Sequence, residues 1–306
     1  NATVMGDLPS STITDETPDI SSADTEKKPR SRSDLIVRLI TGMVALPVIV
    51  TAIFLGGWFV FVPIAFLMLM GVLEFYFMER KRGAQNNALL GVTAASLVLA
   101  AFHFEQPILW QIAVVGTVII TFAIEYGRSK DLSDSLQRIL TTIAGIFYIA
   151  FPMAFLVAIR AGEDGLHWFF AFIYCTWGTD TFAYFAGNMF GKTPLSPKLS
   201  PKKTIEGAVG GMVAGAILPL MVLYQGQIPI TPSVILLFIV ATISAVGADL
   251  FESAVKRFFG VKDSHIPGFN ILPGHGGVLD RIDSTLGVAT VMYIYLVMTG
   301  HLMLLI

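Results

Sequence analysis

The sequence carries little charge and almost no cysteine. Only 14% of its 306 residues are charged, whereas 54% are hydrophobic, and a typical soluble domain is about 25% charged. This composition argues against a single soluble globule, a fully disordered chain and a nucleic-acid-binding protein, whose binding surface would need clustered basic side chains. The single cysteine, Cys175, excludes an internal disulfide and any multi-cysteine metal cluster. The abundant apolar residues therefore indicate an integral membrane protein.

The first 33 residues differ in composition from the rest of the chain. They are rich in Ser, Thr, Asp and Pro, and the first 26 carry six acidic residues and no basic residue. Such a segment cannot bury enough apolar surface to offset the entropy that ordering costs. We therefore expect a disordered tail over residues 1–33 and a transmembrane domain over residues 34–306.

The transmembrane domain consists of apolar stretches separated by short polar loops. A spanning helix needs about 20 mainly apolar residues, because each adds about 1.5 Å against a hydrocarbon core of about 30 Å. The sequence predicts an all-α polytopic protein with about nine transmembrane helices, of which the third and fourth are also compatible with a re-entrant pair. The predicted ranges are 35–55, 58–78, 88–104, 108–125, 138–160, 166–187, 207–224, 234–252 and 284–306.

The basic residues predict the orientation of these helices. Loops on the cytoplasmic side of membrane proteins carry an excess of Lys and Arg. With the N-terminus in the cytoplasm, the inner segments hold all of the 20 basic residues except Arg160. Loss of one span would move every later loop to the other side and destroy this segregation. We therefore expect the N-terminus inside and the C-terminus outside.

Seven acidic residues lie within or beside the predicted spans, all toward their cytoplasmic ends. Charged groups are costly in the hydrocarbon core, so they are usually solvated, paired or functional. For Glu74, Glu125 and Glu252 we expect side chains that reach water at the membrane surface. For the four aspartates the neighbouring residues favour a functional site. These are Asp180, Asp249, Asp280 and Asp283.

The first segment dense in polar residues runs from Gly178 to Gly211. Ser200 and Pro201 resemble a helix N-cap followed by the first helical residue, which would place Lys202 and Lys203 in the first helical turn. Cations are unfavourable there, but the free amides and the two ammonium groups together make a good phosphate pocket. The alternative is that the lysines are ordinary positive-inside residues.

Three glycines follow in the same segment, and their spacing predicts close helix packing rather than catalysis. They are Gly207, Gly211 and Gly215.

The second dense segment runs from Asp249 to Asp283. Asp249, Ser253 and Lys256 share one helical face, and the i, i+3 spacing of Asp280 and Asp283 brings both carboxylates to one face. Three carboxylates beside basic residues suit Mg²⁺, a hard cation that prefers oxygen ligands and substrate phosphates. A set of interfacial ion pairs is the alternative.

The loop between these helices contains Pro273-Gly274-His275-Gly276-Gly277. Its glycines allow close backbone approach to a ligand. His275 either donates a hydrogen bond to a phosphate or caps the turn.

Together these segments resemble the signature of CDP-diacylglycerol synthases, also called phosphatidate cytidylyltransferases. The resemblance spans residues 178–284, about a third of the chain, and segment 264–272 is four residues longer than the family pattern. The downstream residues that carry it are Ser253, Lys256, Arg257, Lys262, Asp263, Pro273, His275, Gly276, Gly277, Asp280, Arg281 and Asp283. The upstream residues are Asp180, Thr181, Ala183, Tyr184, Phe190, Gly191, Lys192, Ser200, Pro201, Lys202, Lys203, Thr204, Glu206 and Gly207.

The resemblance implies transfer of a cytidylyl group from CTP to phosphatidate, giving CDP-diacylglycerol and pyrophosphate for phospholipid synthesis. It implies a homodimer in a bacterial-type cytoplasmic membrane, with an active site that faces the cytoplasm and Mg²⁺, with or without a second cation. Catalytic roles would fall to Lys256, Arg257 and Asp283, and metal binding to Asp249, Asp280 and Asp283. Phosphate binding would fall to Ser200, Lys202, Lys203, Thr204, His275, Gly276 and Gly277, with support from Asp180, Glu206 and Ser253.

Two other functions are compatible with a membrane protein of this kind. A CTP-dependent lipid-alcohol kinase would use the same nucleotide but transfer its γ-phosphoryl group, and the Asp-Arg-x-Asp segment argues against it. An ion-coupled transporter would place its acidic residues near the bilayer midplane, whereas here they cluster toward one membrane face.

Overall fold

The computed structural model describes residues 47–81, 87–128, 132–261, 263–264 and 277–303. The predicted tail, residues 1–33, lies outside the described residues, as do Lys262, His275 and Gly276. The described residues from Val48 onward belong to one packing unit.

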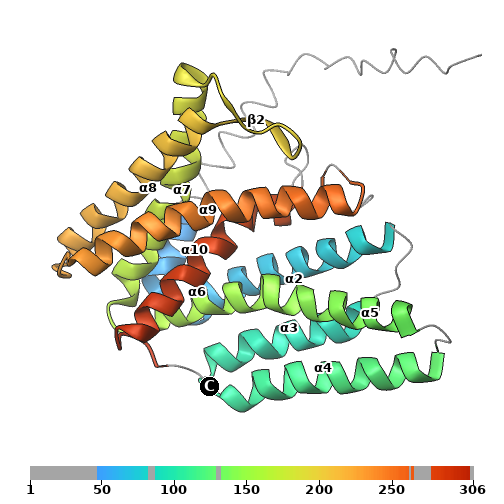
Figure 1. The fold of residues 1–306 in the computed structure, drawn as a ribbon. Coiled ribbons are helices and arrows are strands. Elements are labelled where there is room, and N and C mark those ends of the chain that lie inside the picture. Colours follow the sequence, from blue (N-terminus) through green and yellow to red (C-terminus); the bar gives the residue numbers. More distant parts are fainter. Residues whose placement is uncertain (1–46, 82–86, 129–131, 262, 265–276, 304–306) are drawn as a thin grey trace, which may run out of the picture. The chain divides into compact units, whose positions relative to one another are not determined.

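Most described residues are helical, as predicted (Figure 1). Residues 48–55 form a short helical segment within the first predicted span. The π-helical turn η1 joins α5 to α6 without a break. The remaining helices are α2 (Trp58–Lys81), α3 (Ala88–His103), α4 (Pro107–Arg128), α5 (Leu132–Gly145), η1 (Ile146–Ala150), α6 (Phe151–Ala161), α7 (Gly165–Phe190), α8 (Ile205–Gln225), α9 (Pro232–Phe258) and α10 (Leu279–Met298).

Six of these helical segments are long and apolar enough to cross a membrane, which confirms an integral membrane protein. They are Trp58–Arg80, Pro107–Gly127, Ser135–Ala161, Ile205–Gln225, Pro232–Phe258 and Leu279–Met298. Helix α3 is apolar but shorter, and α7 is not among the six. The count of nine spans stays a prediction.

The last predicted span was misplaced. It was expected at 284–306, but α10 begins at Leu279 and ends at Met298. Asp280 lies in its first turn and Asp283 follows three residues later, so a search for an uninterrupted apolar stretch places the helix start too far along the chain. At its other end, Gly300 adopts a positive φ of 78°, a conformation that suits glycine and leaves the helix.

The structure is not purely helical, because a β-hairpin precedes α8. Strands β1 (Pro194–Ser196) and β2 (Ser200–Thr204) pair antiparallel, with Pro194 opposite Thr204. The predicted N-cap at Ser200 is therefore wrong. Thr204 caps α8 instead, and its hydroxyl accepts a hydrogen bond from the Gly207 amide at 3.2 Å. Strand pairing kept the Ser-Pro segment extended, although its local sequence also suits a helix start.

The three glycines of α8 pack closely against α7, as predicted. A Cβ atom on Gly211 would lie 2.4 Å from the Thr179 carbonyl oxygen, and one on Gly215 would lie 2.8 Å from the Cys175 carbonyl oxygen. A Cβ on Gly207 would lie 2.8 Å from the carbonyl oxygen of Ala183. Only glycine permits this helix separation, which brings the C-terminal end of α7 next to the start of α8.

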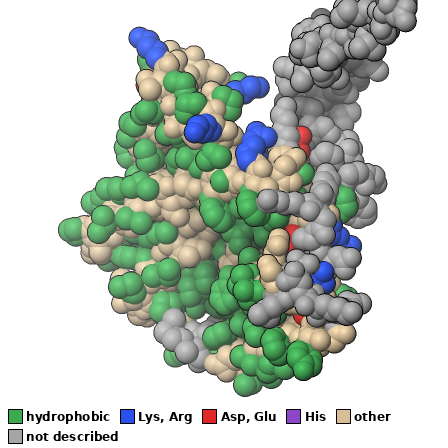
Figure 2. All heavy atoms as spheres, turned by 45° about the vertical axis from the view of Figure 1, so that its right-hand side comes forward, with side chains coloured by type: hydrophobic (Ala, Val, Ile, Leu, Met, Phe, Trp, Pro, Cys, Tyr) green, Lys and Arg blue, Asp and Glu red, His purple; other side chains and the backbone are tan. Residues whose placement is uncertain are grey.

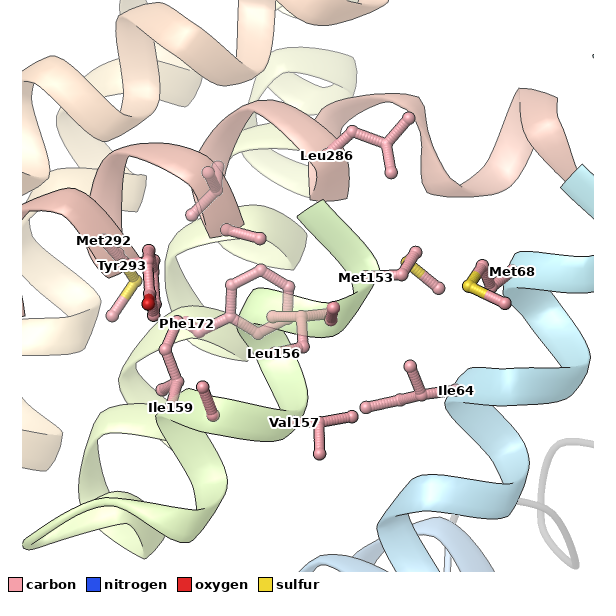
Figure 3. Packing of buried hydrophobic residues seen from close by; sticks show 14 of the residues in the cluster. Ile64, Met68, Met153, Leu156, Val157, Ile159, Phe172, Leu286, Met292 and Tyr293 are labelled. Atoms are coloured by element: carbon pink, nitrogen blue, oxygen red, sulfur yellow. The ribbon is translucent and has the colours of Figure 1, made fainter. Parts of the chain in front are cut away.

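A buried apolar core holds α10 among α2, α6 and α7 (Figure 3). Met68 and Met153 lie side by side, and Leu286 of α10 belongs to the same buried cluster. The Phe155 and Tyr293 rings stack with centroids 4.1 Å apart. These packing contacts fix the position of α10 relative to α2, α6 and α7.

The three glutamates expected to reach water are all buried, so that prediction was wrong. Glu125 pairs with Arg138 at 2.9 Å and Glu252 pairs with Lys256 at 2.5 Å. Glu74 accepts hydrogen bonds from backbone amides at the start of α10. Each carboxylate finds its partners on the protein, because a buried charge without them would be costly.

Candidate active site

A polar cavity of about 470 Å³ lies where α7, the hairpin, α8, α9 and α10 meet. Its residues come from both dense segments predicted above. Four carboxylates line it, from Asp180, Asp249, Asp280 and Asp283, together with the basic side chains of Lys202, Lys203 and Arg281. The structure thus brings together residues up to about 100 positions apart.

One face of α7 forms a wall of the cavity. Asp180, Tyr184 and Asn188 lie on it at four-residue intervals, which is close to the helical repeat. Asp180 accepts a hydrogen bond from the Ser284 hydroxyl at 3.3 Å, which links α7 to α10. Asp180 therefore lies in the cavity wall.

The hairpin brings the two adjacent lysines to the cavity. Lys203 forms an ion pair with Asp249 of α9. Burial lowers the pKa of the Lys203 ammonium below its usual value, while the charges of Asp283 and Asp180 oppose that shift. Lys202 lines the same cavity. Both lysines thus face the cavity from a strand instead of from a helical turn.

Helices α9 and α10 form the opposite wall. Asp280 and Asp283 both line the cavity, in agreement with their predicted shared face. On α9, Asp249 lines the cavity, whereas Ser253 and Lys256 do not. Lys256 lies between two carboxylates, at 2.5 Å from Glu252 and 2.7 Å from Asp280. The second Asp280 oxygen accepts the Gly277 amide at 3.0 Å, so that amide is already used within the protein. Asp283 is only 9% exposed and accepts the Ser284 amide at 2.7 Å.

Several predicted site residues do not line the cavity. Ser253 is buried in α9, and Arg257 is exposed one residue after Lys256. Ser200 starts β2 outside the cavity lining. Their predicted roles, and those of His275 and Gly276 outside the described residues, stay predictions.

Glu206 holds the hairpin to α8. Its carboxylate accepts hydrogen bonds from the amides of Lys192 at 3.1 Å and Thr193 at 3.2 Å, and from the Thr193 hydroxyl at 2.9 Å. These contacts fix the start of the hairpin that carries both cavity lysines, so Glu206 acts at a distance from the cavity.

The sequence assigned no role to five polar residues of the cavity lining, although two of them, Tyr184 and Arg281, belong to the family-like segments: Tyr184, Asn188, Thr179, Arg281 and Ser284. The first two follow Asp180 at helical intervals, so extending its face along α7 would have found them. Arg281 and Ser284 adjoin the two aspartates of α10.

The cavity has the donor chemistry of a hard cation site, because its carboxylate oxygens are the ligands that Mg²⁺ prefers. Two of the three predicted metal ligands are paired with ammonium groups, Asp249 with Lys203 and Asp280 with Lys256. Within the ranges that the structure describes, no three His, Cys, Asp or Glu side chains are grouped closely enough to hold a metal ion. The residue types of the lining fit a divalent cation.

Comparison with known proteins shows the family to which the chain belongs. The model of the cytidylyltransferase family matches residues 36–299. A phosphatidate cytidylyltransferase of Staphylococcus aureus (strain COL) is 32% identical over 264 residues, which cover 85% of this chain and 98% of the relative. The phosphatidate cytidylyltransferase of Thermotoga maritima is 33% identical over 272 residues, which cover 85% and 96%. That of Bacillus subtilis (strain 168) is 43% identical over 158 residues, which cover 51% and 56%. The chain therefore belongs to the cytidylyltransferase family.

Proposed function

We propose that this protein transfers the cytidylyl group of CTP to phosphatidate, giving CDP-diacylglycerol and pyrophosphate. The observation that carries the proposal is that residues of both family-like segments line the same cavity. The chain is also related over most of its length to phosphatidate cytidylyltransferases. Neither a lipid-alcohol kinase nor a transporter is favoured by these relatives.

The reaction requires one phosphorus–oxygen bond to form and one to break. An anionic phosphate oxygen of phosphatidate attacks the α-phosphorus of CTP, and the bond from that phosphorus to the oxygen bridging to the β-phosphate breaks as pyrophosphate leaves. The nucleophile is already ionised, so catalysis rests on in-line positioning and on neutralising charge. Lys202, Lys203 and Arg281 lie where they can contact the phosphates.

The charges of the cavity support a role for Mg²⁺. The described residues of its lining carry four carboxylates against three basic side chains, a formal charge of −1. A triphosphate entering such a cavity needs additional positive charge. Asp249, Asp280 and Asp283 would hold Mg²⁺, with or without a second cation, after Lys203 and Lys256 turn from carboxylate to phosphate. The bound cation would neutralise phosphate charge and polarise the α-phosphate.

The proposed active site faces the cytoplasm in an inner-membrane protein. In Figure 1 the ends of α2, α4 and α9 lie at the right, while the connections after α3, α6 and α8 lie at the left. Figure 2 shows Lys and Arg in the upper part and at the right edge of its view, with hydrophobic side chains over most of the remainder. This arrangement supports the predicted segregation of basic residues. Arg160, on the other side, donates to the carbonyl oxygens of Ile53 at 2.8 Å and Phe54 at 3.1 Å.

Labelled CTP tests the proposed reaction directly. Purified protein with phosphatidate and Mg²⁺ should place an α-phosphate label on the lipid and release a γ-phosphate label in pyrophosphate. Transfer of the γ label to diacylglycerol would establish the kinase instead. With neither transfer, CTP-independent ion uptake by vesicles would point to the transporter.

Cysteine labelling tests the proposed orientation. Cys175 is buried and would be replaced first. Single cysteines at the exposed positions Lys192 and Gln225 should then react with an impermeant reagent from opposite sides of oriented vesicles. Labelling of both from one side would refute the orientation.

The homodimer implied by the resemblance is also part of the proposal. Light scattering of the protein in detergent, corrected for bound detergent, should give twice the chain mass of 33.2 kDa. A single chain mass at all protein concentrations would contradict it.

A further inference from the structure

Glu74 of α2 makes contacts that its position in the sequence does not suggest. The residue is only 6% exposed and lies outside the cavity lining. Its carboxylate accepts hydrogen bonds from the amide of Val278 at 2.9 Å, the amide of Leu279 at 2.8 Å and the hydroxyl of Ser264 at 3.0 Å. Val278 lies 204 residues further along the chain. Both oxygens of this buried carboxylate thus accept hydrogen bonds, two of which come from the amides at the start of α10.

These contacts complete the N-terminus of α10. The first amides of any helix lack partners within the helix and need acceptors from elsewhere. The residue before α10, Val278, has no side chain that can accept a hydrogen bond, and no side-chain cap is formed there. Glu74 supplies the missing acceptors from another helix, and its negative charge is favourable at a helix N-terminus.

Ser264 also connects α2 to α10, because it hydrogen-bonds a residue of each helix. It is fully buried, its hydroxyl donates to Glu74, and its amide donates to Asp280 at 3.4 Å. Glu74 and Asp280 therefore share a partner, so movement of the Glu74 carboxylate would reach a residue of the cavity lining.

Close packing of α2 against α10, one turn before Glu74, keeps the Glu74 carboxylate within hydrogen-bonding distance of the start of α10. A Cβ atom on Gly71 would lie 3.1 Å from the Cδ1 atom of Ile282, so the two helices meet with little free space. Gly71 and Glu74 are three residues apart and lie on the same face of α2. Ile282 lies between Arg281 and Asp283, which line the cavity.

We infer that Glu74 is a positioning residue that holds the first turn of α10 so that Asp280 and Asp283 face the cavity. It does not touch the reacting groups, and its effect on turnover rests on the proposed function. The role assigned to Glu74 explains why a carboxylate is buried in a helix that supplies no residue to the cavity lining.

The kinetic test compares substitutions at Glu74 with a matched control on the same helix. Glu74→Gln keeps the length but replaces one acceptor oxygen with a donor, and Glu74→Ala removes all three hydrogen bonds. We expect kcat to fall roughly 10-fold for Gln and roughly 100-fold for Ala, with the KM for CTP changing less. In the control Tyr76→Phe, the lost hydrogen bond joins α2 to the Thr142 carbonyl at 2.6 Å, away from α10. This variant should lose stability yet keep its kcat.

Hydrogen exchange separates this inference from the proposed function. Peptides covering Val278 and Leu279 should exchange faster in Glu74→Gln than in the unsubstituted protein, and Tyr76→Phe should leave them protected. Wild-type protein without cytidylyltransferase activity but with this exchange pattern would overturn the proposed function and support the positioning. Unchanged exchange in Glu74→Gln, or equal loss of kcat in Glu74→Gln and Tyr76→Phe, would overturn the positioning.

Discussion

The two halves of the protein contribute differently to the site. Among the residues that the structure describes, those that line the polar cavity all lie between Thr179 and Ser284, on α7 to α10 and the hairpin. Helices α2 to α6 contribute buried side chains that support these elements, and Glu74 is the clearest example. The cavity chemistry is thus confined to one half, whereas its geometry depends on both.

The first half also places its charges differently. Its buried carboxylate Glu125 is satisfied by one arginine from the next helix. In the second half, Lys256 is shared between Glu252 and Asp280, and Lys203 pairs with Asp249 inside a cavity. A charge pair in a closed interface contributes to stability, while the same groups around a cavity remain able to exchange partners with a ligand.

The largest expected effect comes from removing a cavity carboxylate. Asp283→Asn should lower kcat roughly 10³-fold, because it removes a charge proposed to hold Mg²⁺. The variant should insert into the membrane and unfold at the same temperature as the original protein. Thermal unfolding in detergent would check the unfolding temperature. Near-normal turnover, or turnover of the original protein that survives chelation of divalent cations, would refute the metal assignment.

A smaller effect is expected from the hairpin lysines. Lys203→Met should lower kcat/KM for CTP roughly 100-fold, since it removes a charge-assisted contact to phosphate. Lys198 is an exposed lysine of the same hairpin and lies outside the cavity lining. Lys198→Met should therefore stay within a few-fold of the original value. Equal losses in both variants would mean that the hairpin contributes only general positive charge.

A glycine in each half provides a third comparison: Gly211 is tightly packed in α8, and Gly116 is loosely packed in α4. Gly211→Ala would place a Cβ 2.8 Å from that of Ala183 and force α7 and α8 apart. We expect a cost of about 1–3 kcal/mol and several-fold lower turnover, because Thr179 and Ala183 line the cavity. In α4, a Cβ on Gly116 meets no described atom within 4 Å.

Gly116→Ala is accordingly the control for that comparison. It should raise stability by up to about 1 kcal/mol, since alanine is the better helix former, and leave turnover unchanged. Thermal unfolding in detergent measures both variants. A Gly211→Ala protein as stable as Gly116→Ala would show that the α7–α8 contact is looser than described.

The smallest effect on turnover is expected in the first half. Glu125→Gln leaves Arg138 without its carboxylate partner, so the protein should be less stable by roughly 3 kcal/mol or less, as Arg138 is partly exposed. Its kcat should match that of the original protein when both are assayed well below their unfolding temperatures. A large loss of kcat would contradict the division of roles between the halves.

The predictions that held were those based on local periodicity. The glycine spacing in α8 predicted close packing, and the spacing of Asp280 with Asp283 predicted a shared face, which lines the cavity. Each depends only on the helical repeat. The helix start at Ser200 failed, because pairing of β2 with β1 opposed a local signal that was itself reasonable.

Composition and periodicity thus identify a membrane protein, its apolar helices and the two segments that carry its polar chemistry. These properties follow from residues near one another in the chain, where hydropathy and the helical repeat act directly. The position of Arg257 outside the cavity, the lysines on a strand and the burial of Glu74 follow from packing between distant segments. Glu74 finds its partners 190 to 205 residues away, and a pattern along the chain cannot report contacts that exist only after the helices have packed.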